Sequence, residues 1–291
     1  MIQHLKISSF FAVWQQYPGL IPVSLRDGVV IWQDVSTYHF YEGFFHKSLN
    51  NLKMLRKEAA TTFSTDIGIL KDDRFAEESL PLSGFIFHTG RCGSTLLTKV
   101  LACSRDNHII SEAQPLNMIF SLFANGGSVG FESTLENRTI YKNLLLSLAR
   151  KRLNTHQRCF VKFSSYNIHF SRFIQTVFPE VPAIFITRDT YEVVASFQKK
   201  PAAWMDESNF LEIKNVYGLP GNNLEEIVTG FKKEADRACI KQVSNKELKP
   251  ENIAHICSQF NYTPESADIG KMKQQFLYDS KVEFNKKQFE R

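Results

Sequence analysis

The strongest chemical signal in the sequence is a glycine-rich loop at residues 90–95, Gly-Arg-Cys-Gly-Ser-Thr. It follows an apolar run at residues 85–87 and precedes an apolar, helix-like run that begins with Leu96 and Leu97. Two glycines let the backbone turn so that several N–H groups point to one place, and a helix N-terminus adds partial positive charge. The loop therefore predicts a site for phosphate or sulfate. The alternative is a glycine-rich turn that binds nothing.

This loop differs from the phosphate loop of nucleotide-dependent kinases. The Walker A pattern G-x-x-x-x-G-K-[ST] has a lysine after its second glycine, whereas Ser94 and Thr95 follow Gly93 here. The cation within the loop is Arg91, which precedes the second glycine. A kinase is therefore the less favoured enzyme class for this loop.

A second candidate site follows the apolar run at residues 183–187. Arg188 comes directly after this run, and Ser196 lies eight residues later on a predicted helix that begins at Thr190. Arg188 is placed to bind an anion, and the alternative is a simple pairing with Asp189 or Glu192.

Together the two segments resemble the sulfotransferases that use 3′-phosphoadenosine 5′-phosphosulfate (PAPS). In that family a P-[KR]-S-G-T-T loop holds the 5′-phosphosulfate, and an R-D strand end with a serine eight residues after the arginine holds the 3′-phosphate. The resemblance is closest to the tyrosylprotein sulfotransferase branch and its bacterial relatives, which use a glutamate base and a catalytic lysine at two strand ends. Glu112, 21 residues after Arg91, and Lys162, 26 residues before Arg188, stand at the spacings of that branch.

The resemblance implies a reaction and a set of site residues. PAPS would be the co-substrate, and its sulfuryl group would pass by in-line displacement to a hydroxyl of a small molecule, carbohydrate or peptide, without a metal. Glu112 would be the general base, while Arg91 and Lys162 would supply positive charge. The implied co-substrate contacts are Gly90, Arg91, Cys92, Gly93, Ser94, Thr95, Leu96, Arg188 and Ser196.

Each catalytic candidate has a simpler alternative. Burial beside an apolar strand is expected to raise the pKa of Glu112, which suits a general base; the alternative is a helix-capping or surface glutamate. Lys162 is either a catalytic cation or a strand-end lysine that faces water. His88 and His169 are rival bases, but Ser164 stands where the cytosolic branch of the family has its histidine.

Two features depart from the family pattern. Cys92 replaces a serine, and a thiol at a helix N-terminus beside Arg91 is expected to favour its thiolate. At the C-terminus the cytosolic branch has a basic segment over the 3′-phosphate, and the local candidate here is Lys281, for which an ordinary solvated lysine is favoured. Residues 243–248 match the corresponding family segment poorly.

The elements that would position these residues are short apolar runs that alternate with amphipathic helices. Such alternation predicts an α/β fold, a P-loop NTPase-like parallel sheet flanked by helices, with ligands at the carboxyl ends of the strands. The expected strands are 84–87, 159–163 and 183–187, and the resemblance implies a further short strand at 109–111. The expected helices begin at Ser94 and Thr190 or cover 140–148, 168–178, 224–231 and 253–260.

We expect residues 1–83 to form a small α+β extension of unknown role. Residues 84–291 are expected to form the sulfotransferase-like domain. Asp27-Gly28 favours a hairpin between two short strands, a helix is expected from Phe45 to Leu55, and residues 77–83 are the best linker candidate. An aromatic cluster either lines an acceptor site or belongs to the core; its members are Tyr38, Phe40, Tyr41, Phe44 and Phe45.

Composition narrows the function classes. The chain has 291 residues, 43% hydrophobic and 22% charged, as in a soluble globular protein. The formal net charge is +5, and its excess falls between residues 84 and 198, so a small anion is a better partner than nucleic acid. The cysteines are scattered, without zinc spacing, and neither a signal peptide nor a membrane-spanning run is evident, so a cytoplasmic location is expected. A non-catalytic nucleotide-binding module is the remaining alternative.

Overall fold

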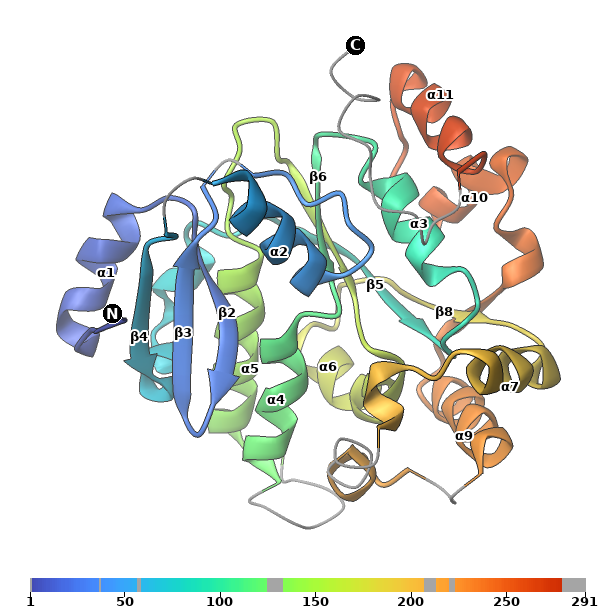
Figure 1. Ribbon diagram of the computed structural model, residues 1–291, viewed down its shortest axis with the longest axis horizontal. Coiled ribbons are helices and arrows are strands. Elements are labelled where there is room, and N and C mark those ends of the chain that lie inside the picture. Colours follow the sequence, from blue (N-terminus) through green and yellow to red (C-terminus); the bar gives the residue numbers. More distant parts are fainter. Residues whose placement is uncertain are drawn as a thin grey trace.

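The structure is a computed structural model that describes residues 2–36, 38–56, 59–124, 133–206, 213–219 and 223–278. Lys281 lies outside these residues. The described chain forms two β-sheets with helices packed around them (Figure 1).

The larger sheet has five parallel strands in the order β6-β7-β5-β8-β9. Its strands are β5 (Leu82–His88), β6 (Asn107–Ser111), β7 (Arg158–Lys162), β8 (Ala183–Thr187) and β9 (Lys241–Ser244). The first four match the predicted apolar runs, and the sheet confirms the predicted α/β fold class. Strand β9 was not predicted because its first two residues are exposed and Val243 is its one buried residue.

Helices cover both faces of this sheet, as side-chain alternation along β5 shows. Phe85 and Phe87 belong to one core cluster, and Ile86 belongs to another on the opposite face. The Ile86 face packs against α3 (Ser94–Leu101), α10 (Ile253–Ser258) and α11 (Ser266–Gln275). The Phe85 face packs against α4 (Gln114–Phe123), α5 (Leu135–Leu148), α6 (Ser171–Val177) and α9 (Leu224–Arg237).

Helix α7 (Thr190–Lys199) follows β8 and packs on α9. The described chain also contains short 3₁₀ helices: η1 (Ile67–Lys71), η2 (Asp73–Ala76), η3 (Ser165–Phe170), η4 (Ala203–Met205), η5 (Asn245–Glu247) and η6 (Pro250–Asn252). The predicted helix over 168–178 is therefore η3 continued by α6. No helix in the described ranges is both long enough and apolar enough to span a bilayer.

The smaller sheet is formed by the N-terminal part, with strand order β1-β4-β3-β2. Its strands are β1 (Gln3–His4), β2 (Leu20–Arg26), β3 (Val29–Asp34) and β4 (Thr62–Asp66), with α1 (Ile7–Gln16) and α2 (Phe45–Leu55) beside them. Asp27 and Gly28 have φ angles of 50° and 74° in the turn between β2 and β3. These left-handed values are what a two-residue hairpin requires, so the predicted hairpin is confirmed.

The N-terminal part shares one core cluster with the larger sheet. Its aromatic side chains Trp14, Trp32 and Phe75 belong to the same cluster as Phe85, and β2 packs against α4 and α5. Figure 1 shows these two helices between the sheets. A division of the chain into domains 1–83 and 84–291 stays a prediction.

Arg150 connects the two parts at their junction. It is 2% exposed, pairs with Glu78, and donates hydrogen bonds to the main-chain carbonyls of Trp14 and Tyr17 at 2.7 and 2.8 Å. The predicted linker is therefore held in place, since Glu78 lies within it and Leu80 N–H bonds to a carbonyl 2.9 Å away at the end of α5.

Candidate functional site

The glycine-rich loop lies at the carboxyl end of β5 and leads directly into α3. Gly90, Arg91 and Gly93 have φ angles of 79°, 51° and 91°, so the chain turns sharply as the two glycines predict. The first hydrogen bond of α3 runs from Leu97 N–H to the Gly93 carbonyl at 3.1 Å. The N–H groups of residues 94–96 therefore have no acceptor within the helix, which is the geometry that binds anions. Anion binding itself stays a prediction.

Lys162 and Glu112 form an ion pair beside this loop. Lys162 ends β7 and Glu112 follows β6; their side chains meet with Nζ 2.7 Å from Oε1, and Glu112 N–H donates to the Lys162 carbonyl at 2.7 Å. Lys162 is fully buried, so the alternative of a water-facing lysine is wrong. Its Nζ also donates to Thr95 Oγ1 at 3.4 Å, which connects the pair to α3.

The expectation that burial raises the pKa of Glu112 is wrong. Burial does oppose ionisation of this carboxyl, but the charge of Lys162 and a hydrogen bond from His88 outweigh it and hold the pKa at about 2. Glu112 does not cap α4, whose N-cap is Ala113. Its side chain is 22% exposed, so an ionised carboxylate at this site is within reach of a hydroxyl group.

His88 is held by the main chain next to Glu112. Gly90 N–H donates to its Nδ1 at 2.9 Å, so the proton of the neutral ring is on Nε2, which donates to the Phe163 carbonyl at 3.0 Å. Nε2 also lies 3.5 Å from Glu112 Oε1. The lone pair of Nδ1 already accepts the hydrogen bond from Gly90, so it is not free to take a proton. His88 is therefore better suited to orient Glu112 than to act as the base. His169 contacts Phe231 instead, and burial lowers its pKa to about 4.

Cys92 belongs to the loop and is buried, with 1% of its surface exposed. Burial raises the pKa of this thiol, but the neighbouring His88 and the hydrogen bond from the Ser94 N–H outweigh the burial and lower the pKa overall. The sequence predicted a favoured thiolate because of Arg91. The structure gives the same direction with a different cause, since His88 is the neighbour.

The two arginines lie on the other side of the loop. Arg91 donates to the main-chain carbonyl of Lys200, its guanidinium lies 5.4 Å from the Phe197 ring, and its Nε is buried without a partner among the described residues. Arg188 follows β8, donates to the Arg91 carbonyl at 3.1 Å and pairs with Glu192 at 2.5 Å. The pairing weighed as an alternative for Arg188 is therefore present, in direct contact with the loop.

Ser196 lies in α7 and is half-buried; its carbonyl accepts from Lys200 N–H at 3.2 Å, at the same helix end that Arg91 contacts.

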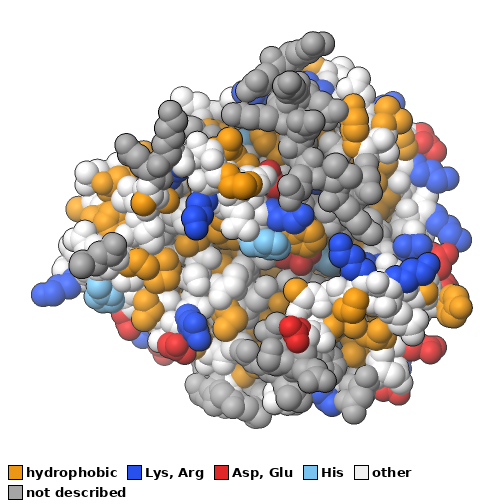
Figure 2. Space-filling model, viewed as in Figure 1, with side chains coloured by type: hydrophobic (Ala, Val, Ile, Leu, Met, Phe, Trp, Pro, Cys, Tyr) orange, Lys and Arg blue, Asp and Glu red, His pale blue; other side chains and the backbone are white. Residues whose placement is uncertain are grey.

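The order of the strands explains where the site residues lie around the loop. Strands β7 and β6 lie on one side of β5 and carry Lys162 and Glu112, while β8 lies on the other side and leads to Arg188. Figure 2, in the same view as Figure 1, shows basic, acidic and histidine side chains near the middle of the visible face of the molecule.

The N-terminal part also contributes to the site, which the sequence alone did not indicate. The Gly43 carbonyl accepts from Lys162 Nζ at 3.3 Å and from Ser111 Oγ at 2.6 Å, and the Phe44 ring lies 4.7 Å from Lys162 Nζ. Of the aromatic cluster, Phe40 and Phe45 are buried in the core. The available signal was a glycine within this aromatic run, and it does not indicate a contact with a lysine over a hundred residues away.

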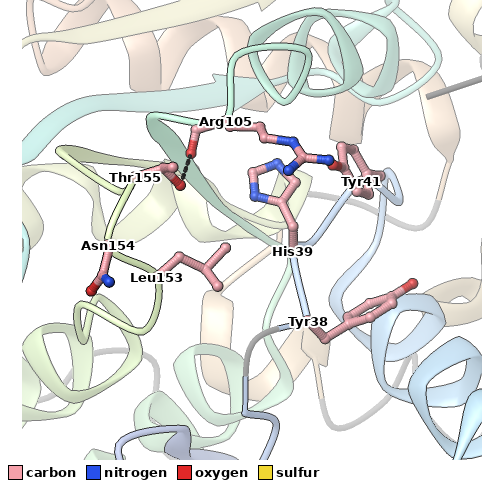
Figure 3. Close-up of a pocket in the computed structure, with 7 residues that line it drawn as sticks. All are labelled: Tyr38, His39, Tyr41, Arg105, Leu153, Asn154 and Thr155. Atoms are coloured by element: carbon pink, nitrogen blue, oxygen red, sulfur yellow. Dashed lines mark hydrogen bonds between the residues drawn. The ribbon is translucent and has the colours of Figure 1, made fainter. Parts of the chain in front are cut away.

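Two further features concern metal binding and the position of a pocket. Within the described ranges, no group of three or more His, Cys, Asp or Glu side chains is arranged to hold a metal ion. A pocket of about 440 Å³ lies elsewhere (Figure 3). Because Arg105 and residues 153–155 line it and precede β6 and β7, this pocket is at the amino ends of the strands, away from the glycine-rich loop.

Comparisons with known proteins give only distant likenesses. No protein-family model matches the chain, and no curated protein matches it. Similar solved structures include a sulfotransferase from Alicyclobacillus acidocaldarius, with 11% identity over 71% of this chain and 87% of that chain and a TM-score of 0.39. A sulfotransferase domain from the curacin biosynthetic pathway has 16% identity over 69% and 80%, with a TM-score of 0.39. A sulfotransferase from Mycobacterium tuberculosis has 12% identity over 78% and 80%, with a TM-score of 0.42. At these identities and TM-scores the likenesses do not establish an activity for this chain.

Proposed function

We propose that this protein is a sulfotransferase that moves a sulfuryl group from PAPS to a hydroxyl of a small molecule, carbohydrate or peptide. The observation that carries the proposal is the buried Lys162–Glu112 pair, 2.7 Å apart, directly beside the N-terminus of α3. A helix end with free N–H groups, a buried cation and an ionised carboxylate would together supply donor binding, charge stabilisation and a proton acceptor for sulfuryl transfer to a hydroxyl. The resemblance of the two sequence motifs to PAPS-dependent enzymes supports the same activity.

The residues around the loop fit a bisphosphorylated nucleotide. The N–H groups of Thr95 and Leu96 would hold the 5′-phosphosulfate, and Arg188 and Ser196 would hold the 3′-phosphate. The buried Nε of Arg91, without a partner among the described residues, is a donor suited to an anion. When bound, PAPS supplies the sulfuryl group and a phosphate leaving group.

In the proposed reaction Glu112 takes the proton of the acceptor hydroxyl while the hydroxyl oxygen bonds to sulfur and the bond from sulfur to the phosphate oxygen breaks. A carboxylate with a pKa of about 2 is a weak base. Lys162 and His88 cause this low value, and the negative charge of a donor bound beside the pair would raise the pKa of the carboxyl. The base therefore becomes stronger when an anionic donor occupies the site.

Calorimetry separates this proposal from a kinase. We expect the protein to bind 3′-phosphoadenosine 5′-phosphate (PAP), the desulfated donor, more tightly than ATP. Tight binding of ATP with no binding of PAP would refute the sulfotransferase proposal.

A transfer assay separates it from a non-catalytic binding module. Phenols, sugars and peptides are screened with radiolabelled PAPS, and Glu112→Gln is compared with wild type and with Glu180→Gln, a control at an exposed position. Loss of a general base is expected to lower kcat by about 100-fold or more. Unchanged transfer in Glu112→Gln would show that Glu112 is not the base, and PAP binding without transfer to any acceptor would favour the module.

A further inference from the structure

Residues 38–44 form a strap that connects the N-terminal sheet to α2 and lies along β6, the edge strand of the larger sheet. His39 Nε2 lies 3.2 Å from the carbonyl of Ala102, and the Phe40 ring packs 5.7 Å from the ring of His108 in β6. Ser111, the last residue of β6, donates to the Gly43 carbonyl. The strap therefore runs from the amino end of β6, where Tyr38, His39 and Tyr41 line the pocket in Figure 3, to its carboxyl end.

A buried carboxylate fixes the strap next to Gly43. Glu42 is 8% exposed and accepts hydrogen bonds from Tyr38, Ser48 and Asn51 at 3.1, 3.1 and 2.6 Å. Two of these donors belong to α2 and one belongs to the strap itself. The main chain that follows Glu42 is thus held from both sides.

At its carboxyl end the strap contacts the buried lysine of the site. Lys162 Nζ has the carbonyl of Gly43 at 3.3 Å and the ring of Phe44 at 4.7 Å, besides its contacts with Glu112 and Thr95. A carbonyl dipole and an aromatic face both attract an ammonium group. Half of the groups described around this ammonium therefore come from the strap.

We propose that Gly43 and Phe44 are positioning residues that hold Lys162 in the geometry required for sulfuryl transfer. This inference rests on the proposed function. It assigns a role in the reaction to the N-terminal part, on the β7 and β6 side of the loop where the acceptor hydroxyl must meet Glu112.

Position 43 must be a glycine because the surrounding atoms leave no space for a side chain there. A Cβ added there would lie 2.2 Å from Thr95 Cγ2, far inside van der Waals contact. Threonine is short and stiff at χ1, so either the strap or Thr95 must move. Both contact Lys162 Nζ, and a displacement of about 1 Å in an active site is able to lower the rate by about 100-fold.

The test compares Gly43→Ala and Phe44→Leu with wild type. Phe44→Trp keeps an aromatic face and serves as the rescuing variant, and Phe178→Leu is the control at another half-buried phenylalanine, at the amino end of β8. The measurements are kcat and KM for transfer, PAP binding by calorimetry, and the rate at which an acetylating ester labels Lys162, read by mass spectrometry against the exposed Lys151.

We expect kcat to fall about 100-fold in Gly43→Ala and about 10-fold in Phe44→Leu. In both variants Lys162 should become open to acetylation, while Phe44→Trp and Phe178→Leu stay close to wild type. Transfer that is unchanged in both variants would overturn the inference, and so would a loss of transfer with Lys162 still protected. If the wild type binds no PAP and transfers nothing, the proposed function fails first, which the calorimetry shows directly.

Discussion

Substitution of Glu112 by glutamine is expected to destabilise the protein strongly at neutral pH and weakly in acid. The fold lowers the pKa of this carboxyl from 4.5 to about 2 because Lys162 and His88 lie beside it. This difference corresponds to about 3 kcal/mol of folding free energy, at about 1.4 kcal/mol for each pH unit.

The sign of the pH dependence follows from the direction of the pKa change. A carboxyl whose pKa is lower in the folded state stabilises the fold fully above its unfolded pKa, and that contribution is lost as the pH falls from 4.5 to about 2. Glu112→Gln lacks this contribution at every pH. The stability difference between wild type and variant should therefore be about 3 kcal/mol at pH 7 and about half of that or less near pH 3.

Urea denaturation at several pH values measures this difference, with Glu180→Gln as the control. The double variant Glu112→Gln/Lys162→Met should be more stable than Glu112→Gln alone at pH 7, because the single variant leaves a buried ammonium without its carboxylate. A difference below about 1 kcal/mol at pH 7, or one that does not shrink in acid, would refute the assigned ion pair and the pKa derived from it.

Three further predictions concern the loop and the junction. Arg188→Ala should weaken PAP binding by about 10- to 100-fold in calorimetry, and equal weakening by Arg172→Ala, an exposed control on α6, would contradict a specific phosphate contact. Iodoacetamide should modify the exposed Cys239 first, and this reaction should leave transfer activity unchanged. The buried Cys92 should react slowly, and its modification should abolish transfer unless PAP is bound. Mass spectrometry alongside the assay follows both reactions, and loss of activity before Cys92 reacts would contradict the prediction. Arg150→Ala should lower the free energy of unfolding by about 3 kcal/mol or more, because the main-chain carbonyls that it binds lose their donor in a buried junction; a loss below about 1 kcal/mol in urea denaturation would contradict this role.

Much of the candidate site follows from local sequence signals. Buried parallel strands read as apolar runs of a few residues, so the polar residues that end them are visible in the sequence. Parallel strands bring their carboxyl ends to one edge of the sheet, which is why Glu112 and Lys162 are close together although 50 residues separate them. The turn at Gly90 and Gly93 follows from the conformational freedom of glycine.

Other properties of these residues depend on distances that a linear pattern does not contain. The pKa of Glu112 depends on whether burial or a neighbouring cation dominates, and the 2.7 Å contact with Lys162 decides for the cation. The direction of the Arg91 side chain depends on the end of α7, where the Lys200 carbonyl accepts its hydrogen bond. Strand β9 has too little apolar character to be recognised before its neighbour β8 is placed.

The sequence alone therefore determined the α/β fold class, the glycine-rich turn and the strand ends that carry Glu112, Lys162 and Arg188, because backbone preferences and burial patterns are local. Only the tertiary structure decided what surrounds the ammonium of Lys162. Gly43 lies 119 residues away along the chain, and its contact with Lys162 exists because packing of α4 and α5 between the two sheets brings the strap to the end of β6. The proposed role of the N-terminal part follows from that packing, whereas the charge state of Glu112 follows from its contacts with Lys162 and His88.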